Sequence, residues 1–182
     1  MPRPNKTISP AQKAALLECF QFATALVPVA LRPQFLLVGG TASIAFSSPL
    51  WTDDVDVAAS AEAIIAFRQA IAWEGSSFAI SPCQMIEFDS RQGFRVSLEL
   101  LQLGGAFVES IAVAEPCYNG FVASLADLIL NRAKTVVGCG EIGDVADLRF
   151  LLEEAARRGM LIPVQEEERR EVLLEAAKEL IL

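Results

Sequence analysis

The chain has 182 residues, with 23 acidic and 15 basic side chains, a formal net charge of −8 and no histidine. This length suits one domain with a hydrophobic core, or one domain with a helical appendage. The absence of imidazole excludes His-ligated zinc, a Ser-His-Asp triad and a Cys-His pair. Because Lys and Arg contacts to phosphate dominate nucleic-acid affinity, the acidic charge also argues against a long nucleic acid as partner.

The cysteines and the hydropathy pattern bear on the compartment. Cys19, Cys83, Cys117 and Cys139 are scattered without C-x-x-C spacing, so we expect reduced thiols. The sequence contains no apolar run long enough to span a membrane and no charged-then-apolar leader. We therefore expect a cytoplasmic protein that does not enter a membrane.

Helices and strands are expected to alternate in the first part of the chain. Ser9 is a candidate N-cap and Pro10 occupies N1, so a helix begins there and ends before Pro28. The elements expected next are an apolar strand at 35–38, a short helix at 41–46, an acidic strand at 55–58 and a helix at 61–73. This alternation with short connections indicates an α/β or α+β fold.

Further strands are expected at 78–80, 85–88 and 94–100. The last of these alternates, which predicts a core face and an opposite face that carries Glu99. The predicted core face consists of Phe94, Val96, Leu98 and Leu100. The segment 105–114 receives no assignment.

The C-terminal part is expected to be helical. Ser124 with Asp127 three residues later resembles a capping box and predicts a helix to about residue 137. Helices at 144–158 and 165–182 should follow. The apolar face of the last helix can pack on the domain or on a second subunit, so a homodimer is one expectation.

The glycines and carboxylates near residues 39–56 point to chemistry. Gly39 and Gly40 follow an apolar strand and open a helix, where backbone without Cβ can approach a phosphate. Side chains alternate along a strand, so Asp54 and Asp56 share one face and Asp53 points the other way. Two adjacent carboxylates repel each other. Mg²⁺ removes that repulsion and binds substrate phosphates at its remaining positions.

The order of an apolar strand, Gly-Gly-Thr-Ala and then Thr-x-Asp-apolar-Asp resembles the signature of the nucleotidyltransferase superfamily with the DNA polymerase beta-like fold. The resemblance extends to its small antibiotic-modifying and toxin-type members. It implies a mixed sheet flanked by helices, with an α/β core at 1–118 and a helical region at 119–182 packed on that core. It also implies that Asp54 and Asp56 bind Mg²⁺ or Mn²⁺.

The resemblance assigns further roles. Gly39, Gly40 and Thr41 would hold the phosphates of an NTP, and Glu99 would be the third metal-binding carboxylate and the proton acceptor. Lys134 would contact phosphate or substrate from the helical half. The following Asp144 and Asp147 also resemble residues that line the family's cleft, although Asp144 suits a helix N-cap equally well.

The implied reaction transfers an NMP from ATP or another NTP to a hydroxyl on a small molecule or a protein, with release of pyrophosphate. Two departures from the family keep a catalytically degenerate binding protein open as an alternative. Glu99 stands where Asp is usual, and Ser48 to Trp51 replace a basic residue before Thr52. Trp51 instead offers a ring for stacking on a base. A metal-dependent glycosyltransferase, which also uses Asp-x-Asp, is the less favoured alternative.

Overall fold

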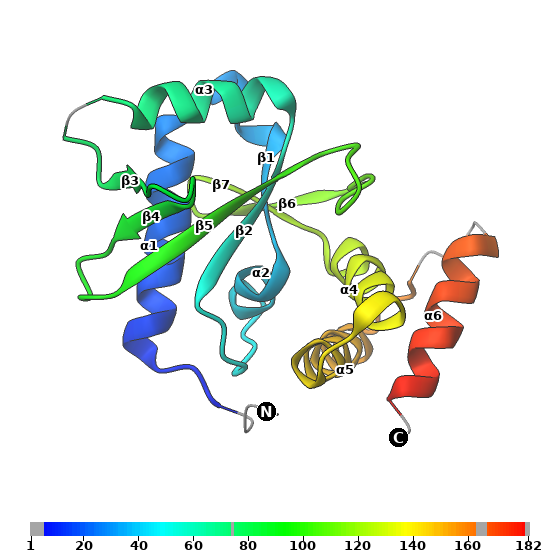
Figure 1. Ribbon diagram of the computed structural model, residues 1–182. Helices are drawn as coiled ribbons and strands as arrows, with labels where there is room; N and C mark the ends of the chain where they lie inside the picture. Colours follow the sequence, from blue (N-terminus) through cyan, green and yellow to red (C-terminus); the bar gives the residue numbers. More distant parts are fainter. Residues whose placement is uncertain (1–5, 74, 163–166, 181–182) are drawn as a thin grey trace.

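A seven-stranded mixed sheet forms the centre of the protein (Figure 1). The computed structural model describes residues 6–73, 75–162 and 167–180. The strands are β1 (Phe35–Val38), β2 (Asp54–Ala59), β3 (Phe78–Ile80), β4 (Ile86–Asp89), β5 (Arg95–Gln102), β6 (Ala114–Cys117) and β7 (Gly120–Ala123). Their spatial order is β3-β4-β5-β2-β1-β7-β6. The β2–β5 and β1–β7 pairs are parallel, and the other pairs are antiparallel.

Helices flank this sheet, as the sequence predicted. They are α1 (Pro10–Leu26), the 3-10 helix η1 (Val29–Gln34), α2 (Gly39–Ala45), α3 (Ala61–Ile71), α4 (Leu125–Cys139), α5 (Ile142–Arg157) and α6 (Glu167–Glu179). The predicted cap of the first helix is confirmed, because the Ser9 hydroxyl accepts a hydrogen bond from the Gln12 backbone N–H at 3.2 Å. Figure 1 shows α4, α5 and α6 grouped beside the sheet as a helical half.

One face of the sheet carries the main hydrophobic core. Val55 of β2 pairs with Leu98 of β5, and both are buried. A row of contacting aromatic rings joins this face to α1 and α3 and consists of Phe35, Phe67, Phe78, Phe88 and Phe22. Because side chains alternate along a strand, Asp54, Asp56 and Glu99 project from the opposite face. The core thus fixes the strands that present the carboxylates.

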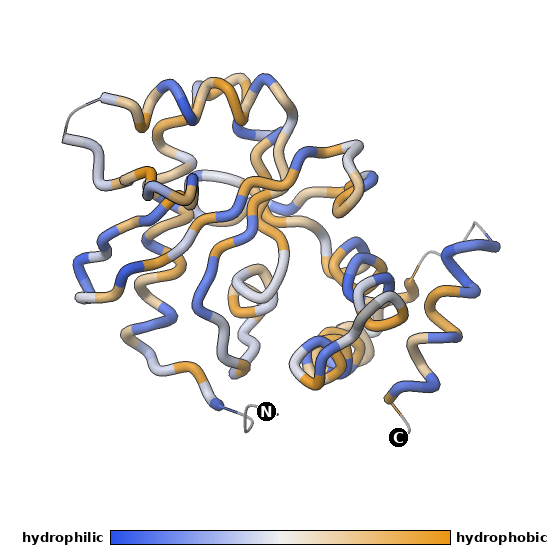
Figure 2. Tube along the Cα trace, in the orientation of Figure 1, coloured by the Kyte–Doolittle hydropathy of each residue, from blue (hydrophilic) through white to orange (hydrophobic). Residues whose placement is uncertain are grey.

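The last helix packs on the domain. Ala176 of α6 is buried, and Val172, Leu173 and Leu180 pack against the core through α4. In Figure 2 apolar and polar residues alternate along α6, whereas the central strands are mainly apolar. The predicted helix was longer, and its residues 165, 166, 181 and 182 lie outside the described residues.

The structure corrects two details of the predicted strand at 94–100. Phe94 precedes β5 and is 37% exposed, so its assignment to the core face was wrong. Leu100 is only partly buried. The physical reason is that Phe94 still belongs to the turn after β4, where its backbone N–H donates to the Ser90 hydroxyl at 3.2 Å. The local alternation does not show where a turn ends.

Sequence reasoning also missed the β6–β7 hairpin. β7 pairs in parallel with β1, so the sheet continues beyond residue 118 and the helical half begins with α4 at Leu125. The expected boundary at 118–119 therefore falls between two paired strands. Cys19, Cys83 and Cys117 are free thiols, as expected. Among the helices of the described residues, none has the length and apolar character needed to cross a membrane.

Candidate active site

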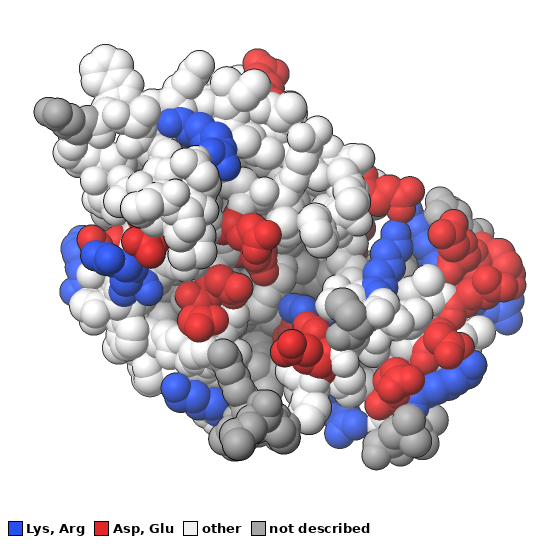
Figure 3. Space-filling model, in the orientation of Figure 1, with Lys and Arg blue, Asp and Glu red and all other residues white. Residues whose placement is uncertain are grey.

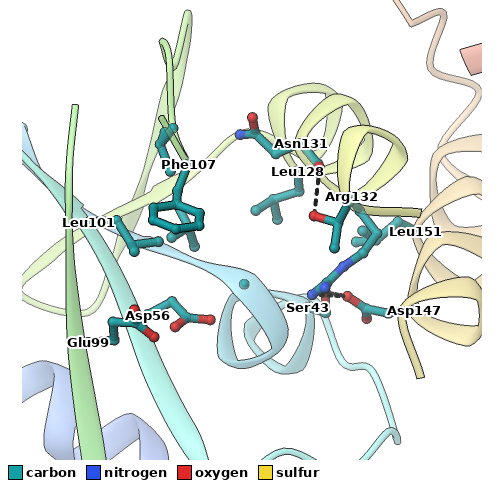
Figure 4. A pocket seen from close by; sticks show the side chains of 14 residues that line it. Ser43, Asp56, Glu99, Leu101, Phe107, Leu128, Asn131, Arg132, Asp147 and Leu151 are labelled. Carbon is teal, nitrogen blue, oxygen red and sulfur yellow. Dashed lines mark hydrogen bonds and ion pairs between the residues drawn. The ribbon is translucent and has the colours of Figure 1, made fainter. Parts of the chain in front are cut away.

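Three neighbouring strands bring the predicted glycines and carboxylates together. Val38 at the end of β1 pairs with Asp56 of β2, and Asp56 pairs with Glu99 of β5. Gly39 directly follows Val38 and begins α2. Residues that are far apart in the chain therefore form one row across the sheet. In Figure 4 the side chains of Asp56 and Glu99 lie next to one another on one side of a cavity.

Position 39 requires a glycine because it lies against Asp56. Its φ is +64°, a left-handed conformation that residues other than glycine rarely adopt. A Cβ at this position would lie 1.9 Å from Asp56 Oδ2 and 3.0 Å from Asp56 Cβ. Only a residue without a side chain leaves the Asp56 carboxylate where it is.

Asp54 is held at both its backbone and its side chain. The buried Thr41 hydroxyl donates to the Asp54 carbonyl oxygen at 2.6 Å, and the Thr52 hydroxyl donates to Asp54 Oδ1 at 2.6 Å. The Gln12 side-chain amide of α1 in turn donates to the Thr52 carbonyl oxygen at 2.8 Å. The Thr41 side chain thus fixes the start of β2. Gly40 packs closely against the same segment, because a Cβ on it would lie 3.1 Å from the Thr52 side chain.

The environment of Asp56 disfavours its charge. Burial, and then the negative charges of Asp54 and Glu99, raise the pKa of Asp56 to about 7, while Arg132 acts in the opposite direction. A carboxyl group that is partly buried beside two other acids gains most from a cation. Oxygen donors of this kind suit Mg²⁺ or Mn²⁺.

The carboxylates are neighbours but do not yet form a closed coordination shell. Within residues 6–73, 75–162 and 167–180, no three acidic or cysteine side chains converge closely enough to hold a metal ion. The donor set and the glycine that makes room for Asp56 nevertheless fit a divalent cation.

A cavity of about 270 Å³ opens in front of Asp56 and Glu99. It lies between the sheet and the helical half, and Figure 3 shows acidic side chains on both sides of a hollow in this face. Its walls come from β1, α2, β2, β5, the segment after β5, α4 and α5. The lining residues are Val38, Gly39, Ser43, Asp56, Glu99, Leu101, Phe107, Val108, Leu128, Asn131, Arg132, Thr135, Asp147 and Leu151.

The helical wall of the cavity contains a paired group of charges. Arg132 of α4 contacts Asp144 at 2.5 Å and Asp147 at 2.8 Å, both on α5. The Ser43 hydroxyl of α2 donates to Asp147 Oδ2 at 3.0 Å. Burial raises the pKa of Asp147, and Arg132 opposes that shift. The N-cap of α5 is Glu141, so the assignment of Asp144 as the N-cap was wrong. Asp144 is the N3 residue of that capping box, where it accepts from the Glu141 backbone N–H, and it also pairs with Arg132.

Lys134 does not line the cavity. It pairs with Glu109 at 2.9 Å, and both side chains are exposed. The cation on the cavity wall is Arg132, which sequence reasoning missed. A helical signal for it existed, because Leu128, Asn131, Arg132 and Thr135 follow the i, i+3, i+4, i+7 pattern of one face. Lys134 lies outside that face.

Trp51 lies at a second cavity of about 260 Å³, which it lines together with Lys6, Asp53 and Phe94. Its indole N–H donates to the Gln12 side chain at 3.0 Å, and the Lys6 ammonium lies 4.9 Å from the ring centroid. Asp53 is exposed and directly precedes β2. Trp51 is therefore not part of the wall that carries Asp56.

Two solved structures are similar to this arrangement of sheet and helices. An antigenic nucleotidyltransferase-like protein from Paracoccidioides brasiliensis matches with a TM-score of 0.64 and 14% identity, over 96% of this chain and 91% of its own. The antibiotic-resistance factor ANT(2'')-Ia matches with a TM-score of 0.53 and 12% identity, over 92% of this chain and 93% of its own.

The chain thus has a nucleotidyltransferase-like fold. No protein-family model and no curated protein matches its sequence. At these identities the structural likeness establishes the fold alone, so activity and substrates have to be argued from the site.

Proposed function

We propose that this protein is a metal-dependent nucleotidyltransferase that transfers an NMP from an NTP to a hydroxyl group. The acceptor is a small molecule or a protein side chain, since the net charge of −8 disfavours a long polyanion. The observation that carries the proposal is the row formed by Gly39, Asp56 and Glu99, in which a glycine makes room for a carboxylate that lies beside other acids.

Asp54 and Asp56 would hold Mg²⁺ or Mn²⁺, with Glu99 completing the set. The cation would neutralise the charge that develops on the triphosphate and its leaving group. The hydrogen bonds from Thr41 and Thr52 keep Asp54 in place before any ligand arrives. This preorganisation matters because positioning and electrostatic stabilisation account for most of the catalysis of phosphoryl-group transfer.

The chain's other groups would position the triphosphate. Gly39 and Gly40 expose backbone beside Asp56, and the first turn of α2 has no side-chain cap. Arg132 lines the same cavity and its positive charge already acts on Asp56. We assign the phosphate-binding charge to Arg132 in place of Lys134, because Lys134 pairs with Glu109 outside the cavity.

Glu99 would act as the proton acceptor. The acceptor oxygen forms a bond to the α-phosphorus, the bond from that phosphorus to the β-phosphate oxygen breaks, and pyrophosphate leaves. The proton of the attacking hydroxyl passes to the Glu99 carboxylate. Glu99 lines the cavity beside Asp56, as this role requires.

The test is pyrophosphate release and label transfer from each of the four NTPs with Mg²⁺ or Mn²⁺, in the presence of candidate hydroxyl acceptors. The Asp54→Asn/Asp56→Asn variant keeps the shape of the site and should lose transfer by at least ~1,000-fold, because two ligands of the cation are gone. Asp53→Asn is the matched control and should retain wild-type activity, since Asp53 precedes β2 and lines the second cavity.

Each alternative has its own result. Metal-dependent NTP binding without pyrophosphate release from any acceptor mixture would favour a binding protein over an enzyme. Turnover of a UDP-sugar would favour the glycosyltransferase. Activity that persists in Asp54→Asn/Asp56→Asn would refute the proposed site.

A further inference from the structure

We propose that Phe107 and Asn131 form the subsite that binds the nucleobase of the NTP. This inference rests on the proposed function and names the part of the substrate that the upper cavity would hold. In Figure 4 the cavity divides into two parts. Asp56, Glu99 and Arg132 make its lower part polar. The upper part is bordered by apolar side chains and one amide, namely Leu101, Phe107, Leu128 and Asn131.

A nucleotide has the same division. Its triphosphate requires the cations and backbone N–H groups, and its base offers two apolar faces with a polar edge. If the triphosphate occupies the polar part beside Asp56, the base extends toward the apolar part, because both belong to one continuous cavity. An acceptor would approach from the open side beside Glu99.

The backbone next to Phe107 is held in place. Phe107 itself lines the cavity and is 83% exposed, so its side chain gains little from its position in the free protein. The neighbouring Val108 is buried, and its carbonyl oxygen accepts from the Gly104 backbone N–H at 2.9 Å. Leu103 and Val108 also form a β-bridge. These contacts anchor Val108, and Phe107 directly precedes it at the cavity.

The ion pair between Glu109 and Lys134 connects this loop to α4. The Lys134 ammonium lies 2.9 Å from Glu109 Oε2. Glu109 is two residues from Phe107, and Lys134 is three residues from Asn131. This contact therefore ties the two walls of the upper cavity together at its rim.

Asn131 has the chemistry to read the edge of a base. Its side-chain amide makes no hydrogen bond to any group in the described part of the chain, whereas its carbonyl oxygen accepts from the Thr135 hydroxyl. A side-chain amide offers a donor and an acceptor together, which is how Asn recognises base edges elsewhere. Aromatic rings stack on all four nucleobases, because every base has a π-face. Phe107 would contribute affinity for the base, and Asn131 would determine which base is preferred.

Trp51 is less suited to this role. Its indole N–H is bonded to Gln12, and its ring lies at the second cavity with Lys6 above it. It does not line the cavity that contains Asp56.

The experiment compares NTPs with inorganic tripolyphosphate, which has the same phosphate chain and no base. Affinities are measured by calorimetry in Mg²⁺ for the wild type, Phe107→Ala, Phe107→Trp and Trp73→Ala. Phe107→Ala should weaken NTP binding by ~5- to 150-fold, the loss expected for one stacked base, and leave tripolyphosphate unchanged. Phe107→Trp should restore NTP affinity. Trp73 is 79% exposed and distant from the cavity lining, so Trp73→Ala is the matched control.

The role of Asn131 is tested by the order of affinities among the four NTPs. Asn131→Asp replaces the donor of the amide by an acceptor and should change that order, while tripolyphosphate serves to correct for the added charge. An unchanged order would overturn the assignment of Asn131.

The outcomes separate this inference from the proposed function. If Phe107→Ala leaves NTP affinity unchanged, or weakens NTP and tripolyphosphate equally, the base subsite is wrong while the metal–triphosphate site stands. A wild type that binds neither ligand in a metal-dependent way overturns both. Thermal unfolding of each variant checks the fold, which an exposed side chain such as Phe107 should not alter.

Discussion

The two walls of the cavity place their acids in opposite electrostatic environments. On the helical wall, Asp147 is only 6% exposed, and its carboxylate forms an ion pair with Arg132 and accepts a hydrogen bond from the Ser43 hydroxyl. On the strand wall, Asp56 has Asp54 and Glu99 as its charged neighbours in the sheet. Pairing with Arg132 offsets the cost of burying Asp147 at the junction of α2, α4 and α5, whereas Asp56 beside two other acids is unfavourable in the free protein and would gain from a bound cation. The difference distinguishes a structural carboxylate from a candidate catalytic one.

The largest expected effect comes from removing the cation of the helical wall. Arg132→Leu leaves Asp147 buried without its charged partner, so the free energy of unfolding should fall by about 3–5 kcal/mol. The double variant Arg132→Leu/Asp147→Leu removes both charges and should recover much of that loss. Urea unfolding measures both values. If the double variant is no more stable than Arg132→Leu, the loss does not come from leaving the Asp147 carboxylate unpaired.

On the strand wall, Gly39→Ala should damage the site more than the fold. The new Cβ would overlap Asp56 Oδ2, so the carboxylate must move, and nucleotidyl transfer should fall about 100-fold or more. Because alanine disfavours the left-handed backbone, the free energy of unfolding should also fall by about 1–2 kcal/mol. Measured rates of pyrophosphate release and urea unfolding separate the two effects.

Gly159 provides the matched control for Gly39. Both have φ of +64°, but a Cβ on Gly159 meets no atom within 4 Å. Gly159→Ala should therefore carry the same backbone penalty and keep wild-type activity. Equal activity losses in the two variants would mean that backbone strain, and not the position of Asp56, explains the result.

The free energy of unfolding should also depend on pH through Asp56. Its pKa is about 7 in the folded protein, against the ordinary value of 3.8 that applies to the unfolded chain. Between these values the folded state binds more protons, so the free energy of unfolding falls as pH rises, and it levels off above about 7. From pH 5 to 8, in EDTA, the wild type should lose roughly 2 kcal/mol relative to Asp56→Asn. A constant difference between the two proteins would show that Asp56 is already ionised at pH 5.

The smallest expected effect concerns the rim of the cavity. Lys134→Ala removes an exposed ion pair with Glu109, which is worth about 0.2–1 kcal/mol. Tripolyphosphate binding should stay unchanged, and NTP affinity should fall by no more than about 5-fold as the loop at Phe107 loosens. A large loss of tripolyphosphate affinity would restore Lys134 as a phosphate contact and would contradict the assignment of Arg132.

The sequence by itself determined the local parts of this site. Asp54 and Asp56 share a face because side chains alternate in any strand, and Gly39 can adopt a left-handed backbone wherever it occurs. The apolar alternation around Glu99 likewise predicted which way its carboxylate points. These features depend on neighbours within a few residues, so they can be read without knowing the fold.

Only the tertiary structure decided which distant groups complete the cavity. The packing of α4 and α5 against α2 selected Arg132 over Lys134 and buried Asp147 beside Ser43. The unassigned segment after β5 became the loop that carries Phe107. The Ser43–Asp147 hydrogen bond joins residues 104 positions apart, and nothing in the local pattern fixes the angle at which helices pack on one another or on a sheet. For that reason the acidic strand and the direction of its carboxylates could be predicted from sequence, whereas the opposite wall required the folded protein.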